Sequence, residues 1–263
     1  PRAVRSPCSA AAPGSHSKNF YYLCEPSAPP ACLDWVKREW SMFRKALVST
    51  LALTMGLLIN SIAMAQVFEP KEAEIALLPH SAKLGMDVAT AFEKRSSIQP
   101  NEFHGEGLTL QEVSDLLWFG YGINRPNDKN KRTAPSSGMA YESDVFMIFP
   151  AGAYKYEPEA HRLVRVSTAD LRLEVAGLQK DMATAPNMLV VAAHPEKLKG
   201  KTPERQHHIA LVAGGTIIQN ICLYCAGAGI RCRPRATMDA EALRKSLGLD
   251  ENAIMVMTHA FCH

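Results

Sequence analysis

The sequence predicts an α+β domain in which one sheet is covered by helices. Two observations support this class. Short apolar runs, Val145–Phe149 and Met188–Ala193, have the length and composition of buried strands, and amphipathic stretches at helical spacing separate them from one another. The composition, with 47% hydrophobic and 21% charged residues, is that of a globular protein with a substantial core.

The first part of the chain is interpreted separately from this domain. Residues 1–41 are rich in Pro, Ser and Ala without periodicity, and we interpret them as a non-structural upstream extension. Residues 42–65 combine a basic pair, an apolar run and the Ala63-Met64-Ala65 cleavage signal, which predicts a secretory signal peptide. The alternative is a membrane anchor, but Ser, Thr and Asn within the run make a poor permanent span. We therefore expect an exported, periplasmic protein whose domain covers residues 66–263.

The charge of that domain argues against a nucleic-acid-binding protein. Of the 29 Lys and Arg residues seven precede Gln66, and of the 26 Asp and Glu residues three do so. The part from Gln66 onward therefore carries 22 basic and 23 acidic residues, so no basic surface is expected there.

The first elements of the domain are two helices. Lys83–Lys94 has apolar residues at helical spacing, and Pro100 follows its end. Thr109-Leu110-Gln111-Glu112 is a capping box, which predicts a helix start, and Gly120 and Gly122 are expected to end that helix. The loop Lys131–Tyr141 then combines two cations, a proline, two serines and a glycine, which suits either a linker or a binding loop for a flat anionic ligand.

The remaining elements alternate between the two types. The pattern predicts a hairpin (154–156 with 163–166), a short helix (171–178) and a second buried strand (188–193). A long apolar core helix (209–226), an amphipathic helix (239–247) and a last strand (254–257) follow. The sequence has no internal repeat and no G-x-G-x-x-G motif after a strand, which argues against a Rossmann nucleotide site.

Six segments in this order resemble one known family. They are EKRSSIQ (93–99), LTLQEVSDLLWFGYGINR (108–125), RTAPSSGMAY (132–141), TAPNMLVV (184–191), GGTIIQNICLYCAGAG (214–229) and PRATMDAEALRKSLGL (234–249). Together they resemble the nitroreductase-like FMN-dependent oxidoreductases, in particular the azoline-oxidase-like branch. The resemblance implies a central, mostly antiparallel sheet flanked by helices. It also implies a homodimer that shares its FMN sites.

The resemblance also implies which residues hold FMN. Arg95, Ser97 and Gln99 match the phosphate side, where charge-assisted donors are needed, although the family has Arg or Lys where Gln99 stands. The other reading of Arg95 is a solvated helix-end residue. The other cofactor-binding candidates fall into three groups. The loop residues Arg132, Pro135, Ser136 and Ser137 are expected to reach the partner's flavin. Gln179 is expected near the ring or ribityl chain, and Ala236 and Thr237 are expected to face flavin N5.

Other conspicuous residues have simpler interpretations. Arg231, Arg233 and Arg235 alternate, so an extended chain places them on one face. An acidic substrate or a cofactor phosphate could bind there, but we interpret the face as a solvated loop face. We interpret Cys222 and Cys225, which lie within the long apolar helix, as small buried hydrophobes, because a reactive thiol needs a helix N-terminus. The alternative is a metal site formed by Cys222, Cys225 and Cys232 with Cys262 or His263. Gln219-Asn220 is interpreted as structural, and His207-His208 as a surface helix start.

The expected function is an FMN-dependent oxidoreductase that passes electrons from a reduced donor, NAD(P)H, to a small conjugated acceptor such as a nitroaromatic or quinone. One alternative is a flavin-dependent dehydrogenase or oxidase that uses no nicotinamide. Another is a flavin-binding protein of the same fold without turnover, which Gln99 and the absence of an acidic residue at Ala236 favour slightly. No catalytic side chain is expected, because the flavin itself carries the electrons.

Overall fold

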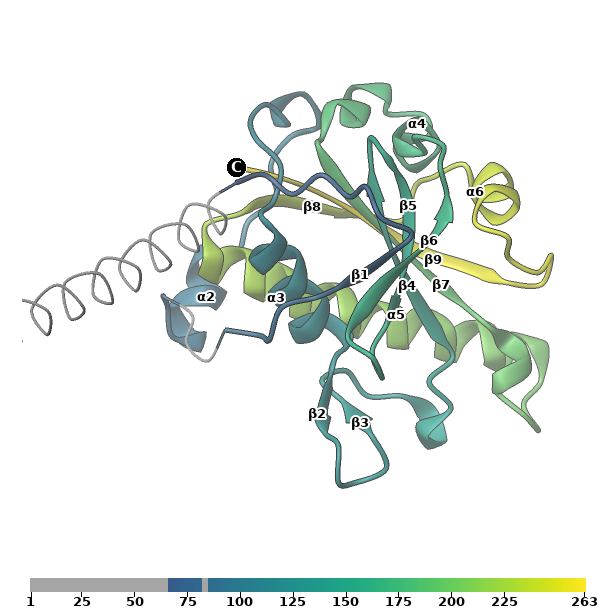
Figure 1. Cartoon of the computed structure of the whole chain (residues 1–263). Helices are drawn as coiled ribbons and strands as arrows, with labels where there is room; N and C mark the ends of the chain where they lie inside the picture. The colour runs from purple at the N-terminus through teal and green to yellow at the C-terminus, as the bar shows by residue number, and fades with distance from the viewer. Residues whose placement is uncertain (1–65, 82–84) are drawn as a thin grey trace, which may run out of the picture. The chain divides into compact units, whose positions relative to one another are not determined.

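The computed structural model describes residues 66–81 and 85–263, all of which belong to one unit of the chain (Figure 1). The upstream extension and the signal peptide, residues 1–65, lie outside the described residues, so both stay predictions. The helices are α2 (Val88–Lys94), α3 (Leu110–Tyr121), α4 (Arg172–Ala176), α5 (Pro203–Ala228) and α6 (Ala240–Ser246). The strands are β1 (Glu74–Ala76), β2 (Ile123–Arg125), β3 (Lys131–Arg132), β4 (Ser143–Phe149), β5 (Gly152–Glu157), β6 (Arg162–Ser167), β7 (Asn187–Ala193), β8 (Arg231–Arg235) and β9 (Ile254–Cys262).

Seven of these strands form the central sheet, in the order β1-β6-β5-β4-β7-β9-β8, and all their pairings are antiparallel. Helices flank this sheet, while β2 and β3 form a separate hairpin that projects at the bottom of Figure 1. The structure thus confirms the α+β class and the antiparallel sheet flanked by helices.

The sheet is buried on both faces, which explains the continuous apolar runs of β4 and β7. Every residue of these two strands is buried. Because side chains alternate along a strand, Val145, Met147 and Phe149 pack into the core shared with α3 and α5, whereas Phe146 and Ile148 pack into the core shared with α4 and α6. The prediction of two buried strands is confirmed.

Helix α5 is the central support of the first core. Thr202 caps its N-terminus by accepting a bond from the Arg205 amide, and Gly229 ends it with a left-handed φ of 73°. A Cβ on Gly214 would collide with Val256 Cγ1, so glycine lets this helix approach the sheet closely. The helix is long and apolar enough to cross a membrane, but 56% of its most apolar window is buried in the domain, as expected for a core helix.

Helix α3 begins as the capping box predicts. The Thr109 hydroxyl accepts from the Glu112 amide, and the Glu112 carboxylate accepts from the Thr109 amide. Gly122 ends the helix, but Gly120 lies inside it, so the expectation that both glycines end it was wrong. A Cβ on Gly120 would lie 2.8 Å from Ile221 Cγ1, which shows that this glycine serves helix packing instead.

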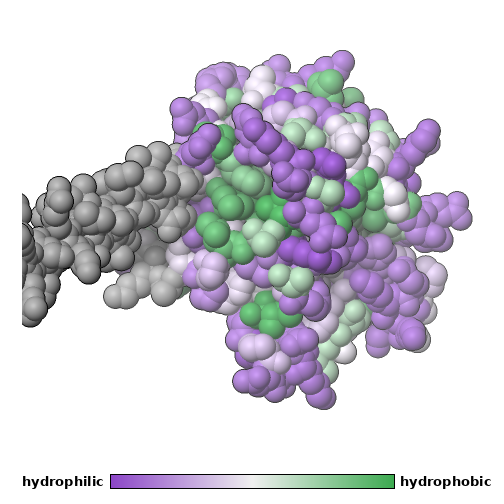
Figure 2. All heavy atoms as spheres, in the orientation of Figure 1, coloured by the Kyte–Doolittle hydropathy of each residue, from purple (hydrophilic) through white to green (hydrophobic). Residues whose placement is uncertain are grey.

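The other predicted elements are present, but α5 begins six residues earlier and β9 ends five residues later than predicted. The first helix begins at Val88 and not at Lys83, because Asp87 caps it, and the hairpin is β5–β6. His207 and His208 are exposed in the first turns of α5, as expected. The sequence reading missed β1, β2, β3 and β8, which are short or lie at an edge. Figure 2 shows a mainly hydrophilic face with apolar side chains gathered near its centre.

Candidate functional site

The first predicted group, Arg95 to Gln99, runs beside the edge strand β8. The Ile98 amide donates to the Cys232 carbonyl at 3.2 Å, and the Arg233 guanidinium donates to the Ile98 carbonyl at 2.8 Å. Arg95, at the end of α2, donates to the Ser97 hydroxyl at 3.4 Å. This arrangement brings two cations and a hydroxyl to one bend of the chain, and the sequence reading did not include Arg233 among the site residues.

Gln99 occupies the end of the same segment. Its side chain is exposed, and its backbone amide donates to the carboxylate of Glu102, which fixes a short 3₁₀ turn at Pro100–Glu102. Gln99 therefore lies beside the bend, but as a neutral residue it adds no positive charge to it.

The three alternating arginines of β8 share one face, but this face is not a solvated loop, so that interpretation was wrong. Arg231 donates to the carbonyls of His104 and His263, and Arg235, only 7% exposed, donates to the Ala176 carbonyl at 2.9 Å. The reason is tertiary: β8 pairs with β9, and neighbouring loops bring their carbonyl groups against it.

The loop that follows β3 is held by four hydrogen bonds, which involve the end of α3, α5 and Tyr141-Glu142. The Thr133 amide donates to the Gly122 carbonyl at 2.9 Å, and Asn220 of α5 donates to the Thr133 carbonyl at 3.5 Å. The Ser136 hydroxyl donates to the fully buried Glu142 at 2.6 Å and accepts from the Tyr141 amide at 2.8 Å. Both bonds of this hydroxyl therefore serve the loop itself, and Asn220 is structural, as expected.

Arg132, the last residue of β3, contacts Tyr141 at the end of the same loop. It is 8% exposed, lies between the rings of Tyr121 and Tyr141 at 4.3 and 4.5 Å, and pairs with Glu159 at 2.8 Å. Burial raises the pKa of Tyr121 to about 12, with Arg132 acting in the opposite direction, so this tyrosine stays neutral near pH 7. Arg132 lines a different cavity from the loop serines, so the structure places it away from the group with which it was predicted.

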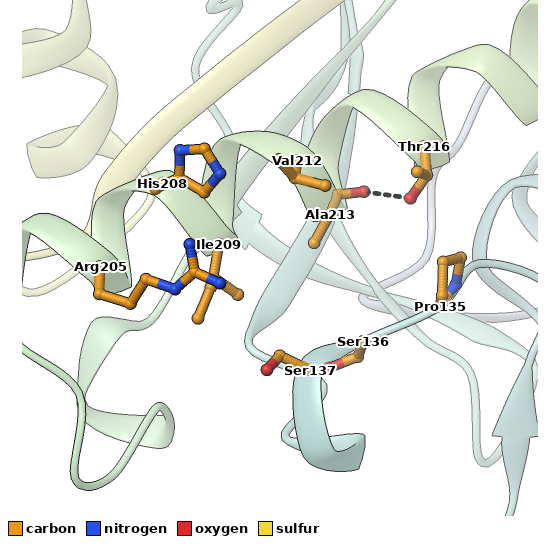
Figure 3. Close-up of a pocket in the computed structure, with 9 residues that line it drawn as sticks. All are labelled: Pro135, Ser136, Ser137, Arg205, His208, Ile209, Val212, Ala213 and Thr216. Atoms are coloured by element: carbon orange, nitrogen blue, oxygen red, sulfur yellow. Dashed lines mark hydrogen bonds between the residues drawn. The ribbon is translucent and has the colours of Figure 1, made fainter.

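The loop serines border a surface cavity of 350 Å³ against α5 (Figure 3). Pro135, Ser136 and Ser137 form one wall, and the facing wall of the cavity is helical: Arg205, His208, Ile209, Val212, Ala213 and Thr216. The sequence placed the loop at a binding site without any signal for this wall: His208 was interpreted only as a surface residue at a helix start, and the other wall residues received no interpretation.

The third predicted group lies where the loop after β8 meets the turn after α4. Gln179, Ala236 and Thr237 are exposed. The Asp239 amide donates to the Glu174 carbonyl at 2.8 Å, which holds the two segments side by side. The predicted site residues thus lie in three groups: Arg95, Ser97 and Gln99; Pro135, Ser136 and Ser137; and Gln179, Ala236 and Thr237. Arg132 lies outside these groups.

Comparison with known proteins identifies the family and the fold. The sequence profile described as "Nitroreductase family" matches residues 92–261, which include all three groups. The chain belongs to the nitroreductase family. Membership makes it an oxidoreductase of a family to which flavin-dependent enzymes belong, and it accounts for the ordered segments noted above.

Known relatives agree with this assignment. A Methanocaldococcus jannaschii protein named as a nitroreductase is 27% identical over 173 residues, which are 62% of this chain and 85% of that protein. A crystal structure from Ralstonia eutropha, also named as a nitroreductase, is 28% identical with a TM-score of 0.68 and covers 75% of this chain and 92% of that one. A chain of the Escherichia coli microcin synthetase complex shares the fold, with a TM-score of 0.55 at 21% identity over 74% and 79% of the two chains.

Proposed function

We propose that the protein is a homodimeric FMN-dependent oxidoreductase that passes electrons from NAD(P)H to a small conjugated acceptor, such as a nitroaromatic or quinone. The observation that carries this proposal is the bend at Arg95–Ile98, which is hydrogen-bonded to β8 within the family match. FMN, when bound, accepts and donates hydride and carries the redox chemistry.

The donor set at this bend fits the phosphate of FMN. A phosphate dianion binds best to charge-assisted donors, and Arg95, Ser97 and Arg233 supply two guanidinium groups and a hydroxyl. Because a guanidinium has five N–H donors, the bond from Arg233 to Ile98 leaves donors for a ligand. Ala236 and Thr237, which directly follow β8, would face the ring, and Gln179 beside them would contact the ring or ribityl chain.

Exposed apolar residues on α2 and α5 support the homodimer. Val88 and Phe92 are 70% and 59% exposed, and Leu211 and Val212 are 43% and 57% exposed. Gly215, on the same side of α5, has open space where a side chain would be, so a second helix could approach closely. Such a face is unusual on a monomer, and we propose that a second copy of the chain covers it.

The loop cavity borders this same face, because Val212 is both exposed on α5 and part of the cavity wall. We therefore propose that Pro135 and Ser137 contact the flavin held by the Arg95 group of the partner. Since both Ser136 hydroxyl bonds are internal, Ser136 would act by shaping the loop, and its backbone rather than its hydroxyl would face the ligand.

One spectrum tests the cofactor. The purified protein should be yellow with the absorption of bound flavin, and after denaturation it should release FMN and not FAD. Colourless protein that takes up no added FMN would contradict the proposal.

Turnover separates the proposed enzyme from the alternatives. Reduction of an acceptor with NADH or NADPH supports the proposal, whereas turnover with dithionite alone favours an oxidoreductase that uses no nicotinamide. Bound flavin without turnover from any of these donors favours a non-catalytic binder.

We also propose that the protein is exported, on the pattern of residues 42–65. Mass spectrometry of the mature chain should show an N-terminus at Gln66, and cell fractionation should place the protein in the periplasm. A mature chain in the cytoplasm that retains residues 42–65 would contradict export.

A further inference from the structure

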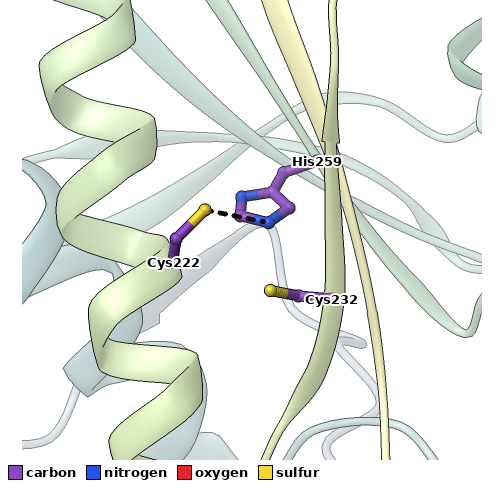
Figure 4. Close-up of side chains that lie close together, drawn as sticks. All are labelled: Cys222, Cys232 and His259. Carbon is purple, nitrogen blue, oxygen red and sulfur yellow. Dashed lines mark hydrogen bonds between the residues drawn. The ribbon is translucent and has the colours of Figure 1, made fainter. Parts of the chain in front are cut away.

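Three metal-binding side chains meet between α5 and the sheet, away from the cofactor groups described above. Cys222 comes from α5, Cys232 from β8 and His259 from β9, and their ligand atoms all lie within 4.8 Å of one another (Figure 4). We propose that Cys222, Cys232 and His259 hold a structural zinc ion, with Cys225 as the fourth ligand.

The strand register explains why these residues meet. Cys232 pairs with Phe261 and Pro234 pairs with His259, so Cys232 and His259 are diagonal neighbours on one face of the sheet. That face packs against the last turns of α5, where Cys222 points toward the same space. Because the three ligands come from one helix and two strands, a bound ion would link α5 to the sheet.

The distances suit a tetrahedral ion. Zinc bound at the usual lengths to sulfur and nitrogen places ligand atoms roughly 3.5–3.8 Å apart. The Cys222 sulfur lies 3.9 Å from His259 Nε2, so closing the pair around an ion requires a shift of only a few tenths of an ångström.

Burial makes the group costly without an ion. Cys222, Cys232 and His259 are 2%, 4% and 1% exposed. Within the described residues, Nδ1 of His259 has no hydrogen-bond partner and Nε2 has only the weak contact with Cys222 sulfur. An imidazole buried in this way loses its bonds to water with little in return, and an ion bound at Nε2 would give the ring one strong partner.

The charges also favour a divalent ion at this place. Two thiolates and a neutral imidazole cancel the charge of Zn²⁺, and the third thiolate, from Cys225, leaves one net negative charge in the site; binding releases three thiol protons to solvent. Thiolate and imidazole ligands are the set that zinc prefers among the common biological ions.

Cys225 is placed to complete the site. It is fully buried one turn along α5 from Cys222. Residues three apart on a helix lie on the same face, and Cys225 belongs to the same buried cluster as Cys222 and Cys232. We therefore assign the fourth ligand position to Cys225.

Metal analysis of the full protein tests this inference. Protein purified with a reductant and without chelators should contain one zinc per chain, and Zn²⁺ should be withdrawn only by a strong chromophoric chelator. Replacement with Co²⁺ should give thiolate charge-transfer absorption and the visible bands of a tetrahedral ion. Zinc content does not depend on flavin, so failure of this inference and failure of the proposed function are separate results.

A matched pair of variants locates the ion. Cys222→Ser should weaken zinc binding by more than about 100-fold, since loss of an outer contact alone costs up to that much. Cys262→Ser should leave it unchanged, because Cys262 is equally buried but packs on the opposite face of the sheet.

Several outcomes would overturn the site. They are wild-type protein without tight zinc, a Co²⁺ spectrum without thiolate bands, an equal loss in Cys262→Ser, or a disulfide between Cys222 and Cys232 in the purified protein. The wild-type Co²⁺ spectrum decides the question even if a variant fails to fold, which circular dichroism would reveal.

Discussion

The arginines of this protein have different roles because their surroundings differ. Arg132 is held between two rings and paired with Glu159, and Arg235 is buried against a carbonyl. Arg95, in contrast, is half-buried and contacts only the Ser97 hydroxyl among the polar groups of the described residues. Arg95 therefore has more bonding capacity left for a ligand than Arg132 or Arg235 has.

Replacing Arg95 should separate cofactor retention from chemistry. Arg95→Ala removes one charge-assisted contact, which costs about 1.5–3 kcal/mol, or roughly 10- to 150-fold in FMN affinity. At saturating FMN the rate with an acceptor should match wild type, because the phosphate lies far from the reacting ring. Fluorescence titration measures the affinity, and Lys94→Ala, an exposed neighbour, is the control. Unchanged FMN affinity would show that Arg95 is a solvated helix-end residue.

Asp144 links stability to pH. Burial raises the pKa of its carboxyl, but hydrogen bonds from His194 and Lys155 outweigh this and lower it from 3.8 to about 2. Because the folded pKa lies below the unfolded value, this carboxylate stabilises the fold above pH 3.8. That contribution is lost as the pH falls through about 2.

Asp144→Asn should accordingly lower the free energy of unfolding at pH 7 by about 2 kcal/mol, and its difference from wild type should narrow as the pH falls below 4. Urea unfolding at several pH values measures both. Asp128→Asn, which breaks an exposed pair with Lys131, should change stability by less than about 1 kcal/mol. A difference that is constant with pH would contradict the linkage.

At the scale of one element, the loop after β3 is organised before any ligand arrives. Its carbonyls, amides and the Ser136 hydroxyl are fixed to α3, α5 and Glu142, while Ser137 is exposed at the rim of the cavity. A loop that is already ordered loses little conformational entropy on binding, which suits contact with a rigid ring.

The two adjacent serines should therefore behave differently. Ser136→Ala leaves the buried Glu142 without its donor and should lower the free energy of unfolding by about 1–3 kcal/mol. Ser137→Ala should stay within about 0.5 kcal/mol of wild type but retain FMN less well. Thermal unfolding measures the stability of both variants, and titration with FMN measures their affinity. A stability loss in Ser137→Ala and none in Ser136→Ala would show that Ser137, not Ser136, holds the loop.

At the scale of the whole molecule, the proposed active site needs two copies of the chain. The cavity that Ser137 borders is lined by the loop and by α5, and none of Arg95, Ser97 and Gln99 lines it. The exposed apolar residues of α2 and α5 provide a face on which a second protomer could bring the groups together.

A charge on that face should separate the subunits and release the flavin. Val212→Glu would bury an unpaired carboxylate in the interface and should give monomers that have lost FMN. Val166→Glu, an exposed valine of β6, is the control and should remain dimeric and yellow. Light scattering with absorption detection measures mass and flavin together. A flavin-loaded monomer would contradict a shared site.

The sequence by itself determined the elements whose information is local. The capping box fixed the start of α3, and period and length identified β4, β7 and α5, because burial of both sheet faces requires continuous apolar runs. It also marked the Arg95 segment and the loop serines through their ordered likeness to a family that the profile match then confirmed.

Only the tertiary structure decided which residues act together. The sequence of β8 resembles a polar loop, since the carbonyls that accept from its arginines are distant in the chain and cannot be foreseen from it. Ser136 resembles a ligand contact, since its bond to Glu142 and the burial of Glu142 arise only in the folded protein. Likewise Cys222 meets His259 through the register of β8 and β9, which no spacing along the chain encodes. Hydrogen bonds and metal ligands depend on distances in space, and those distances exist only once helix and sheet have packed.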